Sequence, residues 1–315
     1  MKTNVLVTGG AGFIGSQLTD RLIEEEYEVL VIDDLSNGKL NNVNKKAQFV
    51  KVNITSQKFA QIFKKLKPKI VFHLAAQSSI NKSLKNPSQD IKINLLATQT
   101  LLEIAKSTNV NKIIFTSSAA VYKPSNLLPI KEDAPKQPIS LYGVSKLCSE
   151  YLIRNFYNIY HLPFITLRLA NVYGPRQDSS AEGGVVSIFI KNILNGNSPK
   201  IHGDGNQKRD FIYISDVLEV FANSLKKNIT GEFNVGKAQE TSINGLFNMV
   251  SRIANIKLDK KYINLSYPEV QRSSLSYEKL RVSSGWTPKV SLEDGLNKTY
   301  KYFKNLYSLG EHRGL

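Results

Sequence analysis

The feature that most constrains the fold is a glycine-rich turn that joins an apolar strand directly to a helix. Residues 4–8 (Asn-Val-Leu-Val-Thr) have the β-branched and apolar composition of a buried strand. Residues 9–15 (Gly-Gly-Ala-Gly-Phe-Ile-Gly) follow without a gap, and a helical pattern runs from 13 to 26. This order turns backbone N–H groups and the positive end of a helix toward a pyrophosphate. The pattern therefore predicts a dinucleotide-binding turn.

Each glycine of the turn has a separate steric role. Gly9 allows the tight turn, Gly12 lets the backbone approach the pyrophosphate, and Gly15 lets the helix lie close to the strand. Phe13 and Ile14 stand between the last two glycines. We expect both of them to lie beside the cofactor.

An acidic residue, Asp33, ends the next strand, which the apolar run at 28–32 predicts. Its carboxylate can accept hydrogen bonds from the adenine ribose hydroxyls, and it would repel a 2′-phosphate. We therefore expect NAD rather than NADP as the cofactor. The alternative for Asp33 is a purely structural role, as a turn or helix cap.

Helices and strands continue to alternate until about residue 170. The pattern predicts a helix at 57–66, a strand at 69–74, a helix at 90–107, and strands at 111–115 and 163–169. This alternation is typical of an α/β fold with a Rossmann-type, doubly wound parallel sheet. We expect an NAD-binding domain over 1–170, with 205–235 packing back onto it. Residues 171–315 are expected to form mainly a smaller, interleaved α/β C-terminal substrate-binding domain.

A tyrosine, a lysine and a serine are the candidate catalytic residues. Tyr142 and Lys146 lie one turn apart on an expected helix, and Ser118 ends a buried strand upstream. A phenol keeps its proton until about pH 10, a nearby ammonium favours the phenolate, and a serine can bond the same substrate oxygen. Tyr300 and Lys304 have the same spacing in an expected surface helix. The serine-ended strand and the dinucleotide turn distinguish the first pair.

Composition and charge exclude several classes of protein. The 315 residues are 41% hydrophobic, which suffices for a large core, and no apolar run suggests a membrane span or a signal peptide. A cytoplasmic protein is therefore expected. One cysteine, Cys148, and four histidines without ligand spacing predict no metal site. The net charge of +16 comes from scattered lysines, which favours solvated helix faces over a nucleic-acid surface.

Seven motifs along the chain resemble those of one enzyme family. They lie at residues 8–16, 33–38, 73–77, 117–122, 142–146, 171–176 and 209–213. Together they resemble the extended short-chain dehydrogenase/reductase family of NAD-dependent epimerases and dehydratases, and within it the UDP-glucose/UDP-N-acetylglucosamine 4-epimerase branch. The resemblance implies a homodimer that pairs through the helices near 90–107 and 141–157.

The resemblance also implies a redox-neutral reaction on tightly bound NAD. Tyr142 would take the proton of the sugar 4-hydroxyl while a hydride leaves the same carbon, and the transient 4-keto sugar would turn over before the hydride returns. Lys146 would hold the nicotinamide ribose and acidify Tyr142, and Ser118 would orient the oxygen. By this resemblance, Ala119 and Ala120 stand at the two positions where the dehydratases of the family have Asp-Glu. Methyl groups cannot transfer protons, so 4,6-dehydration is not expected.

Binding residues follow from the same resemblance. Besides the glycine turn and Asp33, the expected cofactor contacts are Asn37, Asn53, Ile54, Leu74, Ala75, Ala76, Asn94, Tyr142 and Lys146. The expected contacts with the UDP-sugar substrate are Ser118, Tyr142, Asn171, His202, Arg209, Arg272 and Ser273.

Some of these substrate positions bear on specificity. Arg209 matches an arginine that pairs with a phosphate, which suits the guanidinium fork. Residues 266–269 (Ser-Tyr-Pro-Glu) replace Arg-Pro-Gly-Asp, and Arg272 is the nearby residue that could compensate. Ser273 stands where a small residue admits an N-acetyl group. The expected substrates are therefore UDP-GlcNAc and UDP-GalNAc, UDP-Glc and UDP-Gal, or both pairs.

Two other functions stay open on the sequence. One is a reductase that uses NAD(P)H on a 4-keto nucleotide sugar and releases oxidised cofactor. The other is an NAD-binding protein without catalytic activity. Asp33 argues against NADPH exchange in the first, and the intact Ser118, Tyr142 and Lys146 argue against the second.

Overall fold

The computed structural model describes residues 4–180, 183–227, 229–264 and 269–309. It contains two compact units, of which the first comprises 1–123, 135–169 and 218–233, and the second 124–134, 170–217 and 234–315. Residues 124–134 and 205–217 are grouped with the second unit, and 218–233 with the first. The reason is strand pairing, because 208–213 pairs with two other strands of the second unit.

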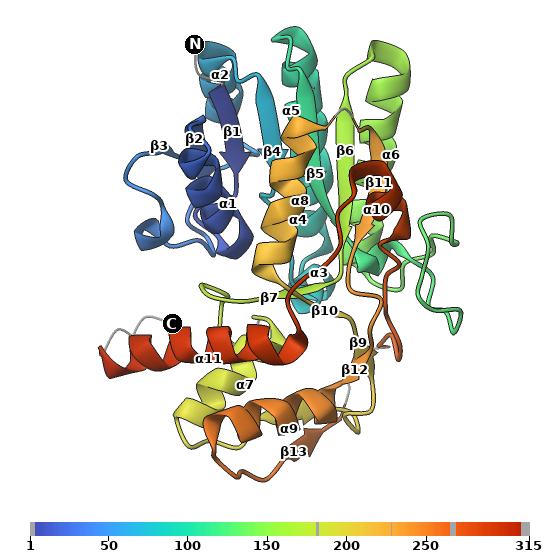
Figure 1. The fold of residues 1–315 in the computed structure, drawn as a ribbon. Helices are drawn as coiled ribbons and strands as arrows, with labels where there is room; N and C mark the ends of the chain where they lie inside the picture. The colour runs from blue at the N-terminus through green and yellow to red at the C-terminus, as the bar shows by residue number, and fades with distance from the viewer. Residues whose placement is uncertain (1–3, 181–182, 228, 265–268, 310–315) are drawn as a thin grey trace. The chain divides into compact units, whose positions relative to one another are not determined.

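A seven-stranded sheet forms the centre of the first unit, in the order β11-β6-β5-β4-β1-β2-β3 (Figure 1). Its strands are β1 Asn4–Thr8, β2 Glu28–Asp33, β3 Gln48–Lys51, β4 Ile70–His73, β5 Lys112–Ser118, β6 Phe164–Leu169 and β11 Gly231–Val235. Every neighbouring pair from β6 to β3 is parallel. The order runs outward from β1 in both directions, which confirms the doubly wound α/β fold.

Helices cover both faces of this sheet. They are α1 Phe13–Glu24, α2 Gln57–Leu66, α3 Ile80–Lys85, α4 Pro87–Ile91, α5 Ala97–Ser107, α6 Leu141–Tyr160 and α8 Ile214–Lys226. α2, α5 and α6 bury apolar side chains against one face, among them Phe59, Phe63 and Leu101. α8 crosses the opposite face (Figure 1), where the rings of Phe72 and Phe221 meet edge to face at 5.8 Å. Each buried side chain of this size contributes about 1.5–3 kcal/mol.

The helix expected at 90–107 is interrupted. α4 starts at Pro87, a π-helical segment (η2, Lys92–Leu96) follows, and α5 continues from Ala97. Proline suits the first helical position because a backbone N–H there has no partner within the helix, so its absence costs no hydrogen bond. A π-helical segment is a frequent feature of functional sites because it redirects side chains.

The second unit consists of short strand pairs and helices. Its elements are β7 Asn171–Tyr173, β8 Lys200–His202, β9 Lys208–Arg209, β10 Phe211–Tyr213, β12 Thr241–Ser242, β13 Lys261–Ile263, α7 Val185–Leu194, α9 Ile243–Ala254, α10 Glu278–Ser284 and α11 Leu292–Ser308. α7, α9 and α11 pack on one another, and Phe189 meets Phe247 at 5.7 Å. The buried Asp210 accepts hydrogen bonds from the backbone N–H groups of Lys237, Ala238 and Leu275. This carboxylate joins three separate segments of the unit.

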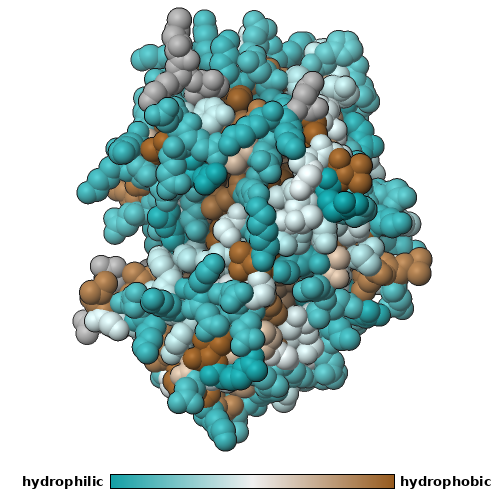
Figure 2. All heavy atoms as spheres, viewed as in Figure 1, coloured by the Kyte–Doolittle hydropathy of each residue, from teal (hydrophilic) through white to brown (hydrophobic). Residues whose placement is uncertain are grey.

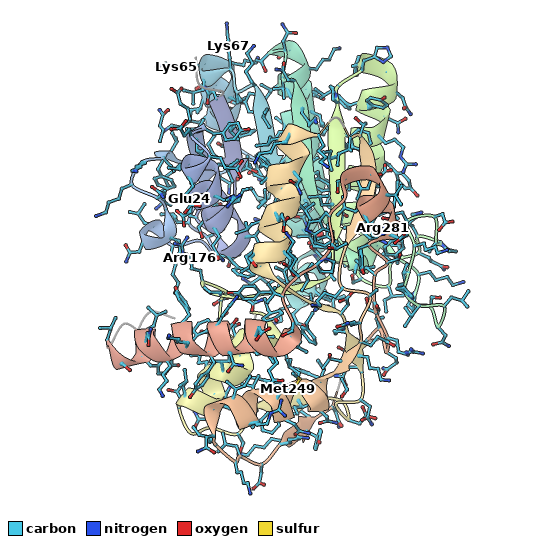
Figure 3. All side chains as sticks on the ribbon, in the orientation of Figure 1. Glu24, Lys65, Lys67, Arg176, Met249 and Arg281 are labelled. Atoms are coloured by element: carbon cyan, nitrogen blue, oxygen red, sulfur yellow. The ribbon has the colours of Figure 1, made fainter. Side chains whose placement is uncertain are left out.

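The face in Figure 2 is mainly hydrophilic, and its apolar side chains lie in small groups. Lys65 and Lys67 lie at the outer end of α2 (Figure 3). Cationic side chains near a helix C-terminus complement the negative end of its dipole. Within the residues that the structure describes, no helix is long and apolar enough to cross a membrane.

Candidate active site

The glycine turn follows β1 at the carboxyl edge of the sheet. Gly9 has φ +73°, a conformation that glycine adopts without strain, and its N–H donates to the Ile32 carbonyl at 2.8 Å. A Cβ at Gly9 would lie 2.7 Å from the Ala75 nitrogen, and a Cβ at Gly15 would lie 2.2 Å from the Gly9 oxygen. The turn is therefore as close-packed as a dinucleotide-binding turn requires. α1 starts after Gly12 with neither a side-chain cap nor an acidic residue in its first turn.

Asp33 lies at the carboxyl end of β2, beside this turn. Its Oδ2 accepts a hydrogen bond from the Ala11 N–H at 3.0 Å, and its Oδ1 accepts one from the Leu35 N–H at 2.8 Å. Burial raises the pKa of Asp33, and these two bonds act in the opposite direction. Each carboxylate oxygen has a further lone pair. Asp33 thus holds the turn in place and can still accept hydrogen bonds from ribose hydroxyls.

The remaining predicted cofactor residues lie along the same edge or in the loops that leave it. Asn53 donates from Nδ2 to Asp34 Oδ2 at 2.7 Å, and Ile54 is buried. Asn37 Oδ1 accepts a hydrogen bond from Lys82 Nζ at 3.3 Å. The backbone nitrogens of Leu74 and Ala75 donate to the carbonyl and the hydroxyl of Thr8, respectively, each at 3.2 Å. The loop that includes Ala76 therefore starts against the last residue of β1. The loop geometry and the donors of the turn fit a dinucleotide.

α6 carries the candidate catalytic tyrosine and lysine. It starts after Ser140, whose Oγ accepts the Gly143 N–H at 3.1 Å as an N-cap. A Cβ at Gly143 would lie 2.4 Å from the Ala120 carbonyl oxygen. The absence of a side chain at this position lets the first turn of α6 lie directly against the 3-10 turn that follows Ser118 (η3, Ala119–Val121).

The structure brings Ser118, Tyr142 and Lys146 together, as predicted from their spacing. Ser118 ends β5, and its hydroxyl shares a hydrogen bond with the phenol of Tyr142. Lys146 is 3% exposed, and its Nζ donates to the Thr116 carbonyl on the same strand at 2.8 Å. Its ammonium also lies 4.6 Å from the centre of the Phe115 ring.

One electrostatic expectation is wrong for the protein chain by itself. Desolvation raises the pKa of Tyr142 to about 12, against the effect of the Ser118 hydrogen bond, and the charge of Asp90 raises it further. Desolvation lowers the pKa of Lys146 to about 8, while the charges of Asp90 and Glu150 act to raise it. The chain alone therefore does not acidify the phenol. One reason is that burial raises the pKa of Tyr142 by more than the Ser118 hydrogen bond lowers it. The other is that Lys146 Nζ donates its hydrogen bond to the Thr116 carbonyl rather than to the phenol.

His73 is a buried core histidine. Its Nδ1 lies 2.8 Å from Thr8 Oγ1, its Nε2 lies 3.0 Å from Thr98 Oγ1, and burial lowers its pKa to about 3. Thr98 donates its own hydrogen to the Asn94 carbonyl at 2.6 Å, so Nε2 carries the imidazole proton. His73 is therefore neutral at working pH values and takes no part in proton transfer.

Asn94 is a buried residue of the π-helical segment η2. It is 2% exposed, and its Nδ2 donates to the Gln77 carbonyl, to Asp90 Oδ1 and to Ser145 Oγ at 2.9–3.1 Å. Protein groups engage this amide, and the cofactor contact expected of Asn94 stays a prediction. The wide π-helical turn around Asn94 directs this side chain inward.

The sequence patterns did not predict a buried ion pair that lies next to the site. Arg168 on β6 pairs with Glu150 on α6 at 2.7 Å, and both side chains are at most 3% exposed. Ser117 Oγ donates to the same carboxylate at 2.5 Å, and Arg168 Nη1 donates to the Tyr122 hydroxyl at 2.8 Å. Glu150 follows Lys146 by four residues, which was the only available signal. The pair ties α6 to β6, and the Ser117 hydrogen bond ties the same carboxylate to β5, the strand that ends in Ser118.

The predicted substrate residues of the second unit gather around residues 207–211. Asn171 N–H donates to the Asp210 carbonyl at 2.9 Å, and the His202 carbonyl accepts from Gln207 Nε2 at 2.7 Å. Ser273 N–H donates to the Lys208 carbonyl at 3.2 Å. These contacts bring together five residues that lie far apart in sequence, namely Asn171, His202, Arg209, Arg272 and Ser273.

Both candidate phosphate arginines form ion pairs with glutamates. Arg209 Nη2 lies 2.6 Å from Glu269 Oε1, and Arg272 donates to Glu240 from Nε and Nη2. Neither glutamate was predicted to be part of the site, because 60 and 32 residues separate the partners. The replacement of the family arginine falls on residues 266–268, which lie outside the described residues, and on Glu269.

Comparison with protein families decides the assignment of the chain. Residues 5–236 match the NAD dependent epimerase/dehydratase family. The chain belongs to this family. NAD is accordingly its cofactor. Among the described residues, no group of three or more His, Cys, Asp or Glu side chains could hold a metal ion.

Solved structures of family members are similar over nearly the whole chain. A UDP-glucose 4-epimerase of Thermotoga maritima with UDP-glucose is 40% identical, with TM-score 0.95 and coverage of 97% of this chain and 100% of that chain. A UDP-N-acetylglucosamine 4-epimerase of Methanobrevibacter ruminantium in complex with UDP-N-acetylmuramic acid is 35% identical, with TM-score 0.90 and coverage of 97% and 99%. A Thermus thermophilus UDP-glucose 4-epimerase with NAD is 34% identical, with TM-score 0.91 and coverage of 96% and 99%.

Proposed function

We propose that this family member is a nucleotide-sugar 4-epimerase acting on UDP-hexoses, UDP-N-acetylhexosamines or both. The observation that carries the proposal is the phenol of Tyr142, which is hydrogen-bonded to Ser118 one helical turn from the buried Lys146. Ala119 and Ala120 follow Ser118 and offer no acid or base for elimination of water. A site with one proton-transfer group supports epimerisation over dehydration.

NAD, when bound, supplies a reversible hydride acceptor and a positively charged ring. The side chains of this protein handle the proton and the orientation. Ser118 and Tyr142 both reach the 4-oxygen of the sugar, and Tyr142 takes its proton and later returns it. The ammonium of Lys146, held by the Thr116 carbonyl, stabilises the negative charge that forms on the phenol.

Cofactor binding is assigned to the edge of the sheet described above. The backbone N–H groups at the start of α1 hold the pyrophosphate, as their lack of a cap supports. Asp33 accepts hydrogen bonds from the ribose, with Asn37, Asn53 and Ile54 near the adenine. Leu74, Ala75 and Ala76 leave room for a flat cofactor. Because the resting pKa of Tyr142 is about 12, the positive charge of the bound cofactor is needed for the phenol to act as a base.

Substrate recognition is assigned to the residues around 207–211. Asn171 and Arg209 bind the diphosphate, Arg272 supplies the second phosphate contact, and His202 lies against the base. To bind phosphate, Arg209 must release Glu269 and Arg272 must release Glu240, so each arginine loses one ion pair. Ser273 leaves space for an N-acetyl group. Substituting Ser273→Tyr should therefore reduce turnover of UDP-GalNAc more than that of UDP-Gal.

A homodimer that pairs through helices of the first unit completes the proposal. Large apolar side chains are 36–63% exposed on neighbouring helices, namely Ile80, Leu84, Ile91, Leu96, Leu141, Val144, Tyr151, Tyr157, Ile159 and Tyr160. Such a group of exposed apolar side chains typically marks an interface. Light scattering of the wild type and of Val144→Glu tests this. A monomeric wild type would contradict the dimer.

The direct test measures epimerisation without added cofactor. The purified protein is incubated with UDP-Gal and with UDP-GalNAc, and each 4-epimer is followed by NMR. Tyr142→Phe should lower turnover by about 10²–10⁴-fold while NAD stays bound. Tyr300→Phe is the matched control, because Tyr300 and Lys304 repeat the spacing on α11, and it should keep full activity. Equal activity of Tyr142→Phe and the wild type would refute the mechanism.

A further inference from the structure

Asp90 is a buried carboxylate next to the candidate catalytic pair with no role in the mechanism above. It lies on α4, is 1% exposed, and α4 packs on α6. Its Oδ1 accepts hydrogen bonds from Gln77 Nε2 at 2.8 Å and from Asn94 Nδ2 at 3.1 Å. Its Oδ2 accepts none from the part of the chain that the structure describes. Burying a carboxylate with half of its acceptors unused costs stability.

The bonded oxygen of Asp90 organises the two groups that hold α6 in place. Gln77 and Asn94 exchange hydrogen bonds, since Gln77 N–H donates to Asn94 Oδ1 and Asn94 Nδ2 donates to the Gln77 carbonyl, both at 2.9 Å. Asn94 Nδ2 also donates to Ser145 Oγ, which in turn donates to the Tyr142 carbonyl at 3.0 Å. Asp90 is therefore connected by hydrogen bonds to the turn of helix between Tyr142 and Lys146.

The negative charge of Asp90 acts on both members of this pair. It raises the pKa of Tyr142 and also raises the pKa of Lys146. Glu150 differs from Asp90 because its charge raises the pKa of Lys146 but is not among the causes of the shift at Tyr142. Glu150 is also paired with Arg168 on β6. His73 of β4, which is neutral as described above, is a further titratable group near Lys146. Asp90 is thus the carboxylate whose charge affects the phenol and the ammonium together.

We propose that Asp90 is a positioning residue for the reaction, which fixes the Gln77 loop and Asn94 against α6 and keeps its negative charge toward Tyr142 and Lys146. The inference rests on the proposed function, since it gives Asp90 a task in the same proton transfer. A carboxylate in this place ensures that Lys146 stays an ammonium while Tyr142 keeps its proton until cofactor and substrate are bound. This role explains why an incompletely bonded carboxylate is retained in the interior.

Asp90→Asn tests the charge while keeping the shape and the Oδ1 acceptor. Without the charge, the pKa values of Tyr142 and Lys146 should both fall. In the pH profile of kcat, the acid limb reports the pKa of the base, Tyr142, and the alkaline limb reports the pKa of the Lys146 ammonium. Both limbs should therefore move to lower pH. Glu150→Gln is the comparison variant and should move the alkaline limb alone.

The pH profiles are measured on holoenzyme of the wild type and both variants with UDP-Gal. A purely structural role would lower kcat at every pH and leave both limbs in place, and this result would overturn the proposal. Asp90→Ser is a second variant for the case that the asparagine amide disturbs folding. Its smaller hydroxyl removes the charge without adding a bulky donor, and the same two shifts are expected.

A second readout does not depend on epimerase activity. With ¹³Cζ-labelled tyrosine, the signal of Tyr142 is assigned by its loss in Tyr142→Phe, and its titration is followed by NMR. In Asp90→Asn this titration should start at lower pH than in the wild type. An unchanged titration would refute the inference even if the enzyme proves to be an epimerase. A shifted titration in a protein without epimerase activity would instead refute the proposed function and keep the inference about Asp90.

Discussion

Lys146 Nζ donates a 2.8 Å hydrogen bond to the backbone carbonyl of Thr116, two residues before Ser118 on the same strand. This contact joins the candidate catalytic lysine of α6 to the strand that carries the candidate catalytic serine. Among the residues that the structure describes, no carboxylate lies at hydrogen-bond distance from this buried lysine, and desolvation lowers its pKa to about 8. Its charge is therefore present at neutral pH but is lost under mildly alkaline conditions.

Activity should consequently fall as pH rises through about 8. The ammonium is present below this pKa and absent above it, so the alkaline limb of kcat reports Lys146. Lys146→Met should lower kcat by about 10²-fold or more at every pH, because the positive charge is gone. Lys146→Arg keeps its charge and should remove the alkaline limb, at a lower maximum. An alkaline limb that persists in Lys146→Arg would assign the limb to another group.

Asp33 predicts a measurable choice between the two nicotinamide cofactors. In Asp33→Asn the charge that repels a 2′-phosphate is lost, and one backbone acceptor for Ala11 or Leu35 is lost with it. The preference for NAD over NADP should fall by about tenfold or more, which is about 1.4 kcal/mol. Dissociation constants of both cofactors, titrated into cofactor-stripped protein, measure this ratio. Asp34→Asn is the matched control and should leave the ratio unchanged.

The buried pair of Arg168 and Glu150 should carry more stability than any exposed pair. Arg168→Met leaves the Glu150 carboxylate buried without its cation and should cost about 3–5 kcal/mol in the free energy of unfolding. The matched control is Arg154→Met, whose partner is Glu232 and whose side chain is 47% exposed, at a cost of about 0–1 kcal/mol. Urea unfolding compares the two. Equal costs would show that burial does not set the strength of the pair.

Local sequence patterns predicted those parts of the molecule that local physics determines. The glycine turn, the acidic Asp33 at the end of a strand and the spacing of Tyr142 and Lys146 depend on neighbours within about one turn or one strand. Two parallel strands, each read from its own apolar run, then bring Asp33 and Ser118 to the same edge of the sheet. Once the hydrophobic periodicity of each segment is recognised, the fold class and the candidate catalytic residues can be predicted.

The remaining features depend on contacts between distant segments. Asp90 looked like a polar residue on an amphipathic helix, and only the π-helical segment after it brings Asn94 to the Gln77 loop. The acceptor of Lys146 is a backbone carbonyl 30 residues away, which no residue pattern encodes. The glutamate partners of Arg209 and Arg272 come from loops that lie far from them in the sequence. Such pairings follow from the packing of the chain and not from its periodicity.

Gly143 offers a test of the close approach between α6 and the turn after Ser118. A methyl group at this position would lie 2.4 Å from the Ala120 carbonyl oxygen, so α6 or the turn must shift in Gly143→Ala. Because Tyr142 is the adjacent residue, a displacement of about 1 Å should lower kcat by about 10²-fold. NAD should stay bound, because the glycine turn is not affected. Activity is measured as epimer formation, and stability by urea unfolding.

Gly245 is the matched control for this substitution, because it also occupies the third position of a serine-capped helix. Its N–H donates to Ser242 Oγ at 3.0 Å, just as the Gly143 N–H donates to Ser140 Oγ at 3.1 Å. A Cβ at Gly245 would meet only side-chain atoms, at 3.1 Å and beyond. Gly245→Ala should therefore keep full activity and change the free energy of unfolding by at most about 1 kcal/mol, since alanine favours the helix. Full activity in both variants would show that the catalytic tyrosine does not depend on the contact between Gly143 and Ala120.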